Sequence, residues 1–262
     1  MVQLKFGVVG AGHIGKRHME MIRRNPAFHL VAFADIRDKE ACGVEDDIPR
    51  HASLQDMINV HSDLDVICVC TPNGCHAEQA ILALEADCHV VIEKPMALNR
   101  QDGEGILHCA LSRGKQVFCV MQNRYSPPSI WLKEMVSSGV LGNIHMVQVQ
   151  CYWNRDDRYY EKIPWKGRLD LDGGTLFTQF SHFIDLMYWV FGDIHRIQSR
   201  FFDFNHQDNT EFEDSGLVSF EFVKYNALGT FNFSTSVANQ NFESSVTIIA
   251  EKGTIKVGGQ YM

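Results

Sequence analysis

The alternation of short apolar runs with helical stretches over residues 1–121 constrains the fold more than any other feature of the sequence. The apolar runs are rich in β-branched residues and span 5–9, 30–34, 66–70, 89–92 and 117–120. The helical stretches between them span 14–24, 54–60, 77–86 and 101–112. Near-continuous apolar strands joined by helices indicate a parallel sheet that is covered on both faces. Residues 1–121 are therefore predicted to form a doubly wound α/β domain, with Asn99 capping its last helix.

After residue 121 the pattern changes to a period of two residues. Apolar side chains alternate with polar ones over 218–222, 231–234 and 246–250, which predicts a largely antiparallel sheet with one face on a core. One helix is predicted over 175–191, because apolar residues recur there at helical spacing, namely Phe180, Phe183, Ile184, Met187 and Val190. Residues 122–262 are therefore predicted to form an α+β domain with a largely antiparallel open sheet.

Charge and composition exclude several classes of protein. Lys and Arg number 24 and Asp and Glu 32, a net charge of −8 that argues against nucleic-acid or anionic-membrane partners. No apolar run approaches the roughly 18 residues of a membrane span, and the N-terminal residues do not read as a signal peptide. The eight cysteines contain no CxxC pair and the 12 histidines no metal-ligand spacing. We expect reduced cysteines, no metal and a cytoplasmic protein.

The strongest local signal is Gly10-Ala11-Gly12-His13-Ile14-Gly15, between a predicted strand and a predicted helix. In such a motif the first glycine makes the tight turn, the second lets the backbone approach a pyrophosphate, and the third lets helix and strand pack. His13 and Ile14 open the helix, whose free N–H groups suit phosphate oxygens. A glycine-rich turn that matches by chance is the alternative. The position of Asp35, which ends the next strand 20 residues after Gly15, favours a dinucleotide site.

Asp35 and Arg37 bear on the choice of dinucleotide. A carboxylate accepts hydrogen bonds from the ribose hydroxyls and repels a 2′-phosphate, whereas an arginine two residues later can meet that phosphate. NAD is the favoured cofactor, and NADP is the less favoured one.

Two further loops follow predicted strands, and the carboxyl ends of parallel strands are where open α/β sheets bind ligands. The first is Thr71-Pro72-Asn73 with His76, and the second is Glu93-Lys94-Pro95. Ordinary turn chemistry explains either loop taken alone. Together with the glycine turn, they indicate one crevice.

These motifs, followed by Gln122-Asn123-Arg124-Tyr125, Asp172-Gly173-Gly174 and Ser181-His182-Phe183-Ile184-Asp185, resemble the glucose-fructose oxidoreductase, inositol dehydrogenase and MocA (Gfo/Idh/MocA) family. The resemblance spans nearly the whole chain. It implies a Rossmann domain followed by a domain whose open sheet mediates oligomerisation, here as a homodimer or homotetramer. The implied chemistry is NAD(P)-dependent oxidation or reduction at a hydroxyl carbon of a sugar or cyclitol.

The resemblance implies that Lys94 and His182 flank the nicotinamide and the substrate. A histidine suits removal of a hydroxyl proton, and a lysine can stabilise charge on the same oxygen. Without the motif, His182 would be interpreted as a core histidine of an amphipathic helix. The remaining cofactor-binding residues implied are Thr71, Asn73, His76, Glu93, Gln122 and Trp165.

Thr178 departs from the family pattern, since many members carry an Asp four residues before the histidine. Members acting on UDP-activated hexuronates also lack that Asp, and their Trp-x-Gly element and Gln are similar to Trp165-Lys166-Gly167 and Gln179. This subgroup resemblance is to UDP-N-acetylglucosaminuronate 3-dehydrogenases. The substrate-binding residues implied are Lys94, Arg124, Tyr125, Lys166, Arg168, Thr178, Gln179 and His182. The alternative for the cationic and aromatic residues is an ordinary surface loop.

The sequence leaves three functions open. The first is an NAD-dependent dehydrogenase that takes hydride from a secondary hydroxyl of a sugar or nucleotide sugar, with a UDP-N-acetylhexosaminuronate as first candidate. The others are an NAD-dependent glycosidase that oxidises C3 transiently, and a non-catalytic NAD-binding sensor. Family members continue beyond the strand predicted over 254–257, so we expect the second domain to be truncated. Outward polar residues such as Ser219 and Asn232 leave the oligomeric state open.

Overall fold

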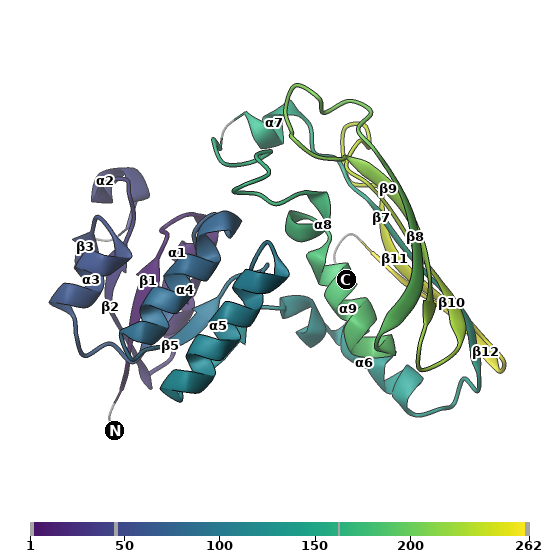
Figure 1. Cartoon of the computed structure of the whole chain (residues 1–262), viewed down its shortest axis with the longest axis horizontal. Helices are drawn as coiled ribbons and strands as arrows, with labels where there is room; N and C mark the ends of the chain where they lie inside the picture. The colour runs from purple at the N-terminus through teal and green to yellow at the C-terminus, as the bar shows by residue number, and fades with distance from the viewer. Residues whose placement is uncertain (1–2, 45–46, 162, 260–262) are drawn as a thin grey trace. The chain divides into compact units, whose positions relative to one another are not determined.

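The computed structural model describes residues 3–44, 47–161 and 163–259. The chain divides into two compact units, Met1–Val120 and Met121–Met262 (Figure 1). The first unit has the α/β architecture expected from its sequence, and the second is built around a separate sheet.

The first unit contains a six-stranded parallel sheet with the order β3-β2-β1-β4-β5-β6, which is the order of a Rossmann fold. Its strands are β1 (Leu4–Val9), β2 (Phe28–Ala34), β3 (Arg50–His51), β4 (Val66–Val69), β5 (His89–Ile92) and β6 (Val117–Cys119). The strand order reverses between β1 and β4. The carboxyl ends of these neighbouring strands therefore form the edge at which such sheets bind ligands.

Helices cover both faces of this sheet, as predicted. They are α1 (His13–Arg24), α2 (Lys39–Cys42), α3 (Leu54–Val60), α4 (His76–Glu85) and α5 (Arg100–Arg113), with the 3₁₀ turn η1 (Asn73–Cys75) before α4. One apolar cluster packs residues of α3, α4 and α5 against the sheet, and another packs residues of α1. The predicted cap is confirmed, because the side chain of Asn99 accepts a hydrogen bond from the backbone N–H of Asp102 at 2.9 Å.

The second unit contains a mixed six-stranded sheet with the order β12-β11-β7-β10-β9-β8. Only the pair of β7 and β10 is parallel, so the prediction of a largely antiparallel sheet is confirmed. The strands are β7 (Ile144–Tyr152), β8 (Ile194–Phe202), β9 (Ser215–Phe222), β10 (Ala227–Ser234), β11 (Glu243–Ala250) and β12 (Gly253–Gly258). The helical segments are η2 (Gln122–Tyr125), α6 (Pro127–Ser137), α7 (Asp157–Tyr160), α8 (Thr175–Thr178) and α9 (Ser181–Phe191).

The core of this unit lies between its sheet and the helices α6 and α9. The alternating phenylalanines of β9 and β10 point into it and meet aromatic side chains from α9 and the residue before it. The rings of Phe180 and Phe233 lie 5.5 Å apart, and those of Phe191 and Phe222 lie 5.2 Å apart. Ile184, one of the apolar residues that recur at helical spacing, is 37% exposed and lies outside this core.

The prediction of a single helix over 175–191 is wrong, because the structure has two helices there, α8 and α9. Phe180 leaves the helical conformation with ψ near 5°, and its backbone N–H bonds to the carbonyl of Thr175, five residues back. The break lets the Phe180 ring enter the core between Trp153 and Phe233. Packing thus overrides a continuous helical pattern.

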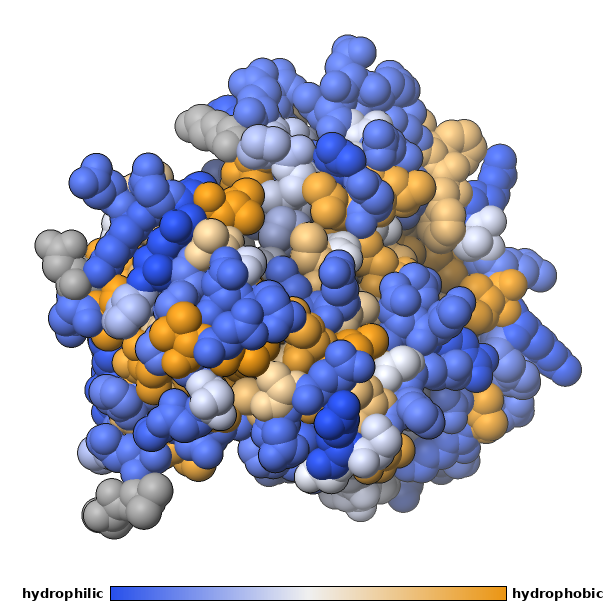
Figure 2. Space-filling view, turned by 60° about the vertical axis from the view of Figure 1, so that its left-hand side comes forward, coloured by the Kyte–Doolittle hydropathy of each residue, from blue (hydrophilic) through white to orange (hydrophobic). Residues whose placement is uncertain are grey.

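The surface is mostly hydrophilic on the face that Figure 2 shows, with hydrophobic residues in separate patches. Among the described residues, no helix combines the length and the apolar character that a bilayer span needs. All eight cysteines are free thiols, and five of them are buried. Burial raises the pKa of Cys68 to about 12, so that thiol stays protonated and packs as a core residue.

Candidate functional site

The glycine turn joins β1 to α1 at the carboxyl edge of the first sheet. Gly10 has φ of 89°, and a Cβ on it would lie 2.5 Å from the carbonyl oxygen of Cys70. A Cβ on Gly15 would lie 1.8 Å from the carbonyl oxygen of Gly10, whereas one on Gly12 would meet nothing within 4 Å. The turn is thus closely packed at its two ends and open at Gly12.

This open position suits a bound pyrophosphate. Gly12 is the N-cap of α1 and supplies no side-chain cap, and His13 and Ile14 are exposed at the start of the helix. The first N–H groups of a helix have no acceptor within it, and the helix dipole adds positive potential there. The residues present therefore fit the phosphates of a dinucleotide.

Asp35 lies against the same turn. Its Oδ2 accepts a hydrogen bond from the backbone N–H of Ala11 at 2.7 Å, and its carboxylate accepts two from the guanidinium of Arg37, both at 2.9 Å. Burial opposes ionisation of Asp35, but the hydrogen bonds from Arg37 and Ala11 lower its pKa to about 2. Asp35 and Arg37, which the sequence analysis singled out separately, form one ion pair, with the ionised carboxylate at the position that binds ribose in such folds.

His76 joins the two loops that follow β4 and β5. Its ring lies 2.7 Å from the carbonyl oxygen of Pro95 through Nδ1 and 2.9 Å from that of Thr71 through Nε2, and its side chain is 1% exposed. Burial lowers the pKa of this imidazole, the hydrogen bonds to the two carbonyls opposing the shift. Asn73 is buried beside it. These contacts favour a role in positioning the loops over direct contact with a cofactor.

Glu93 ties the second loop to α1. Its Oε1 lies 2.8 Å from Nε2 of His18, and its Oε2 accepts a hydrogen bond from the backbone N–H of Lys94 at 3.2 Å. Sequence reasoning did not assign His18, because no motif marks it and 75 residues separate it from Glu93. The pair fixes the segment that carries Lys94, which is followed by the cis bond Lys94–Pro95.

In the second unit His182 lies at the start of α9, 8% exposed. Nε2 of Gln122 lies 3.1 Å from Nε2 of His182. Because an amide nitrogen only donates, the imidazole Nε2 accepts in this contact and its proton is on Nδ1. His182 therefore presents the nitrogen that a general base needs.

The segment around Gln122 is held against α9. Nε of Arg124 donates to Oδ2 of Asp185 at 2.7 Å, and a second nitrogen of the same guanidinium bonds to Oδ1. Tyr125, next in the chain, is 81% exposed. Arg124 thus has a clear structural partner in Asp185, and its role toward a substrate stays a prediction.

Thr178 contacts a buried carboxylate. Its hydroxyl donates to Oδ1 of Asp172, whose carbonyl oxygen is also within 2.8 Å, and Asp172 Oδ2 accepts from the backbone N–H of Gly167 at 2.8 Å. Sequence reasoning noted the missing Asp at position 178 and gave Asp172 no role. The structure supplies a carboxylate one hydrogen bond from that position.

Gln179 and Lys166 belong to one group of polar and aromatic residues. Gln179 is buried, accepts from Nε of Arg155 and donates to the hydroxyl of Tyr159, both at 2.7 Å. Lys166 Nζ lies 3.2 Å from the centre of the Tyr159 ring. Trp165, half-exposed, precedes this lysine. Sequence reasoning missed Arg155, which no motif marks.

Arg168 behaves as an ordinary surface residue. It is exposed, and its Nη2 lies 2.8 Å from Oδ2 of Asp170. The interpretation of this arginine as a substrate-binding residue gains no support from its contacts.

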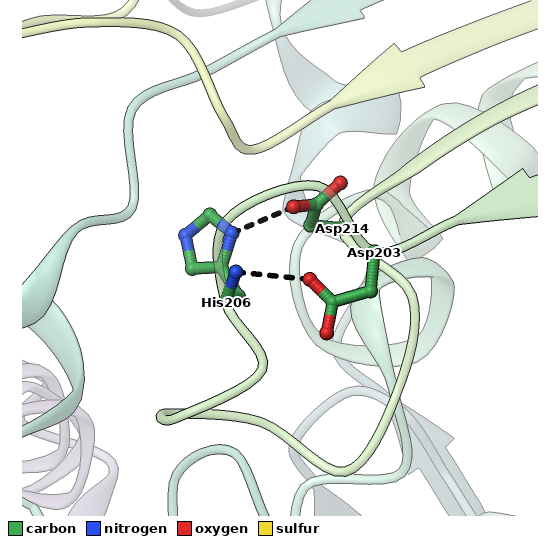
Figure 3. Close-up of side chains that lie close together, drawn as sticks. All are labelled: Asp203, His206 and Asp214. Carbon is green, nitrogen blue, oxygen red and sulfur yellow. Dashed lines mark hydrogen bonds and ion pairs between the residues drawn. The ribbon is translucent and has the colours of Figure 1, made fainter.

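A further group of ionisable side chains, Asp203, His206 and Asp214, closes the loop between β8 and β9 (Figure 3). Nδ1 of His206 lies 2.9 Å from Oδ2 of Asp214, and its Nε2 meets the carbonyl oxygen of Arg155. The backbone N–H groups of Phe204 and Asn205 donate to the same Oδ2 of Asp214. Hydrogen-bond donors therefore surround Oδ2 of Asp214, where a cation would need free oxygen ligands. This arrangement favours a role in holding the loop in place over a role as a cation site.

The predicted site residues fall into two sets. The glycine turn, Asp35, Thr71, Glu93 and Lys94 belong to the first unit, and Gln122 and His182 to the second. The members of the first set follow strands of one parallel sheet at its carboxyl edge, and Gln122 contacts His182 in the second unit. The joint action of Lys94 and His182 on one substrate stays a prediction.

Comparison with known families matches both units. Residues 4–121 match the family described as "Oxidoreductase family, NAD-binding Rossmann fold", and residues 130–256 match the "GFO/IDH/MocA C-terminal domain".

Two solved structures are similar over 99% of the chain. The WlbA dehydrogenase from Chromobactrium violaceum, in complex with NADH and UDP-GlcNAcA, is 34% identical with a TM-score of 0.92, and the chain covers 75% of it. The WlbA dehydrogenase from Bordetella pertussis, with the same ligands, is 32% identical with a TM-score of 0.93, and the chain covers 77% of it.

Curated relatives are more distant. The 1-carboxy-3-chloro-3,4-dihydroxycyclo hexa-1,5-diene dehydrogenase of Comamonas testosteroni is 28% identical over 70% of the chain. The inositol 2-dehydrogenase of Salmonella typhimurium is 27% identical over 83% of the chain. The chain spans 46% of the first relative and 63% of the second.

Proposed function

Because this chain belongs to the Gfo/Idh/MocA oxidoreductase family, we propose that the protein oxidises a secondary hydroxyl of a sugar with NAD as the hydride acceptor. The observation that carries the proposal is the 34% identity over 99% of the chain to a dehydrogenase crystallised with NADH and UDP-GlcNAcA. The open glycine turn and the acceptor nitrogen of His182 support it.

We assign the cofactor to the first unit. The N–H groups at Gly12, His13 and Ile14 would hold the pyrophosphate, and Asp35 would accept hydrogen bonds from the ribose hydroxyls. An ionised Asp35 repels a 2′-phosphate, which favours NAD over NADP. When bound, NAD supplies the nicotinamide carbon that accepts the hydride.

We assign to His182 the role of the base that takes the proton of the substrate hydroxyl. The substrate hydroxyl replaces Gln122 as the donor to Nε2, and the imidazole takes up the hydroxyl proton. The ammonium of Lys94 donates a hydrogen bond to the same oxygen and stabilises the negative charge that develops there.

For the substrate we propose a UDP-N-acetylhexosaminuronate that is oxidised at C3. The support is the similarity to two WlbA dehydrogenases whose crystals contain UDP-GlcNAcA, together with Trp165-Lys166-Gly167 and the buried Gln179. Thr178 is compatible with this proposal, because its hydroxyl is bonded to the carboxylate of Asp172.

The test follows the near-ultraviolet absorbance of reduced nicotinamide when the protein meets NAD and UDP-N-acetylglucosaminuronate, with myo-inositol and glucose in parallel. We expect a rise with the nucleotide sugar alone. Lys94→Met and His182→Gln should abolish the rise while NADH still binds. No rise with any sugar, in protein that binds NADH, would reject the dehydrogenase. Release of free sugar from an aryl glycoside, without accumulation of NADH, would favour the glycosidase.

We also propose that the protein self-associates as a homodimer or homotetramer through the outer face of the second sheet. Supporting this, Leu217 of β9, Leu228 of β10 and Ile249 of β11 are exposed at the sheet. Light scattering of the purified protein tests it, and a monomer at micromolar concentration would refute it.

A cytoplasmic location is proposed because all eight cysteines are free thiols, as is usual in a reducing compartment.

A further inference from the structure

Two cationic side chains lie over the ring of Tyr159. Nζ of Lys166 is 3.2 Å from the ring centre, and Cζ of Arg155 is 5.0 Å from it. The ring face attracts each cation, but the two cations repel each other. A fold that holds two like charges around one ring gives up stability, and such arrangements are common where a ligand of opposite charge binds.

Lys166 carries its charge in an unfavourable place. Its side chain is partly buried, and its Nζ donates to the carbonyl oxygen of Tyr159 at 3.3 Å. None of the ion pairs within residues 3–44, 47–161 and 163–259 includes Lys166. Burial, together with the charge of Arg155, lowers its pKa to about 8, although Asp172 acts in the opposite direction. An anion close to Nζ would remove this strain.

Arg155 is held in a fixed direction. Its guanidinium lies between the rings of Trp153, at 4.8 Å, and Tyr159, at 5.0 Å. Nε donates to Gln179 Oε1 at 2.7 Å, and Nη1 donates to the carbonyl oxygen of Asn154 at 2.6 Å. A guanidinium fixed in this way binds a planar or tetrahedral oxyanion with little loss of side-chain entropy.

The hydroxyl of Tyr159 completes the group. Because Arg155 can only donate, the oxygen of Gln179 must face it, and the amide nitrogen of Gln179 then donates to the phenolic oxygen at 2.7 Å. The phenolic oxygen is therefore an acceptor in that contact, and its own proton points elsewhere. Burial raises the pKa of Tyr159, so the hydroxyl keeps its proton and can donate it in a hydrogen bond.

We propose that Arg155, Lys166 and the hydroxyl of Tyr159 form a subsite that binds an oxyanion of the substrate, a carboxylate or a phosphate. Gln179, which orients both Arg155 and Tyr159, precedes His182 by three residues, so the subsite would fix the sugar relative to the proposed base. The subsite deepens the proposed function and rests on it.

The test is isothermal titration of NADH-loaded protein with three probes: UDP-N-acetylglucosaminuronate, the uncharged-sugar counterpart UDP-N-acetylglucosamine, and UDP. Lys166→Met removes the charge and keeps a long apolar stem. Tyr159→Phe removes only the hydroxyl. Arg158→Met is the matched control, because Arg158 is exposed and paired with Asp156. Each variant is first shown to melt as one folded species and to bind NADH as the wild type does.

We expect Lys166→Met to weaken binding of the anionic probe by about 10- to 100-fold, as for a lost hydrogen bond to a charged group. Tyr159→Phe should weaken it by a smaller factor, and Arg158→Met should leave it within about twofold of the wild type. A loss confined to the uronate assigns the subsite to the carboxylate. An equal loss for all three probes assigns it to the diphosphate.

Wild-type affinity for every probe in Lys166→Met would overturn the subsite, as would an equal loss in Arg158→Met. Failure of the wild type to bind any of the probes would overturn it as well. Because titration does not depend on turnover, a protein that binds the uronate through Lys166 and forms no NADH would refute the proposed reaction and keep the subsite.

Discussion

Two glycine-to-alanine substitutions in one turn should have opposite consequences. A Cβ on Gly12 would meet nothing within 4 Å, so Gly12→Ala costs the folded protein little. A Cβ on Gly15 would lie 1.8 Å from the carbonyl oxygen of Gly10, far inside van der Waals contact. Gly15→Ala must therefore displace the backbone of the turn.

The magnitudes follow from these distances. We expect Gly12→Ala to change the free energy of unfolding by less than about 0.5 kcal/mol, as for an unstrained surface position. Gly15→Ala should cost about 3 kcal/mol or more, at the upper end of overpacking, and lower the Tm by about 6–12 °C. The methyl group that Gly12→Ala adds would take the space assigned to the pyrophosphate. Loss of one or two hydrogen bonds to a charged group should weaken NADH binding by about 10- to 100-fold.

The assays are calorimetric melting and titration of NADH fluorescence on the same preparations. The informative result is the separation of the two effects, namely weak binding with a normal Tm in Gly12→Ala. Retention of NADH affinity within twofold in Gly12→Ala would refute the assignment of the pyrophosphate to this turn. A Tm of Gly15→Ala equal to that of the wild type would refute the packing argument.

Three further outcomes follow from the contacts of the second unit. The stability of the wild type should rise between about pH 8 and pH 10.5, because Lys166 has a folded-state pKa of about 8 and the unfolded chain therefore binds more protons in that range. Lys166→Met should remove this rise, an effect of about 1–2 kcal/mol after solvent screening. Thermal melts across that pH range measure it. Asp214→Asn should lower the free energy of unfolding by about 2 kcal/mol, since it replaces the carboxylate that accepts the hydrogen bonds of the loop by a neutral amide. Hydrogen bonds from His206, Ser215 and Ser236 hold the pKa of Asp214 at about 2 against burial. The stability that this carboxylate contributes is therefore present above about pH 4 and lost as the pH falls through 2, where acid titrations of the wild type and the variant should converge. If Gln122 acts through His182, Gln122→Leu should lower kcat about tenfold and leave the affinity for NADH normal. A loss of NADH affinity would instead show that Gln122 binds the cofactor.

Local pattern was sufficient to predict the glycine turn and five of the six strands of the first sheet, but not the two-residue strand β3. Buried parallel strands need continuous apolar runs, and a phosphate-binding turn needs glycines at fixed spacing, so both features are written in consecutive residues. Asp35 could be found because its distance from Gly15 along the chain is set by one helix and one strand. The cap at Asn99 could be predicted because the capping side chain and the N–H of Asp102 that it accepts from are only three residues apart.

Contacts between distant residues could not be predicted in this way. Glu93 and His18 are 75 residues apart, and Arg155 and Gln179 are 24 apart, so no periodicity relates them. The break before α9 escaped prediction because the apolar pattern continues through it. The helix is interrupted where the ring of Phe180 packs in the core against Phe233, a contact between residues far apart in the sequence.

The most direct test of the proposed reaction is hydride transfer from UDP-N-acetylglucosaminuronate that carries deuterium at C3. Mass spectrometry of the nicotinamide cofactor after incubation reports the fate of the label. We predict reduced cofactor that carries the deuterium in the wild type, and none in Lys94→Met or His182→Gln. Reduced cofactor that lacks deuterium would contradict oxidation at that carbon. So would the absence of any reduced cofactor in protein that binds both NADH and the nucleotide sugar.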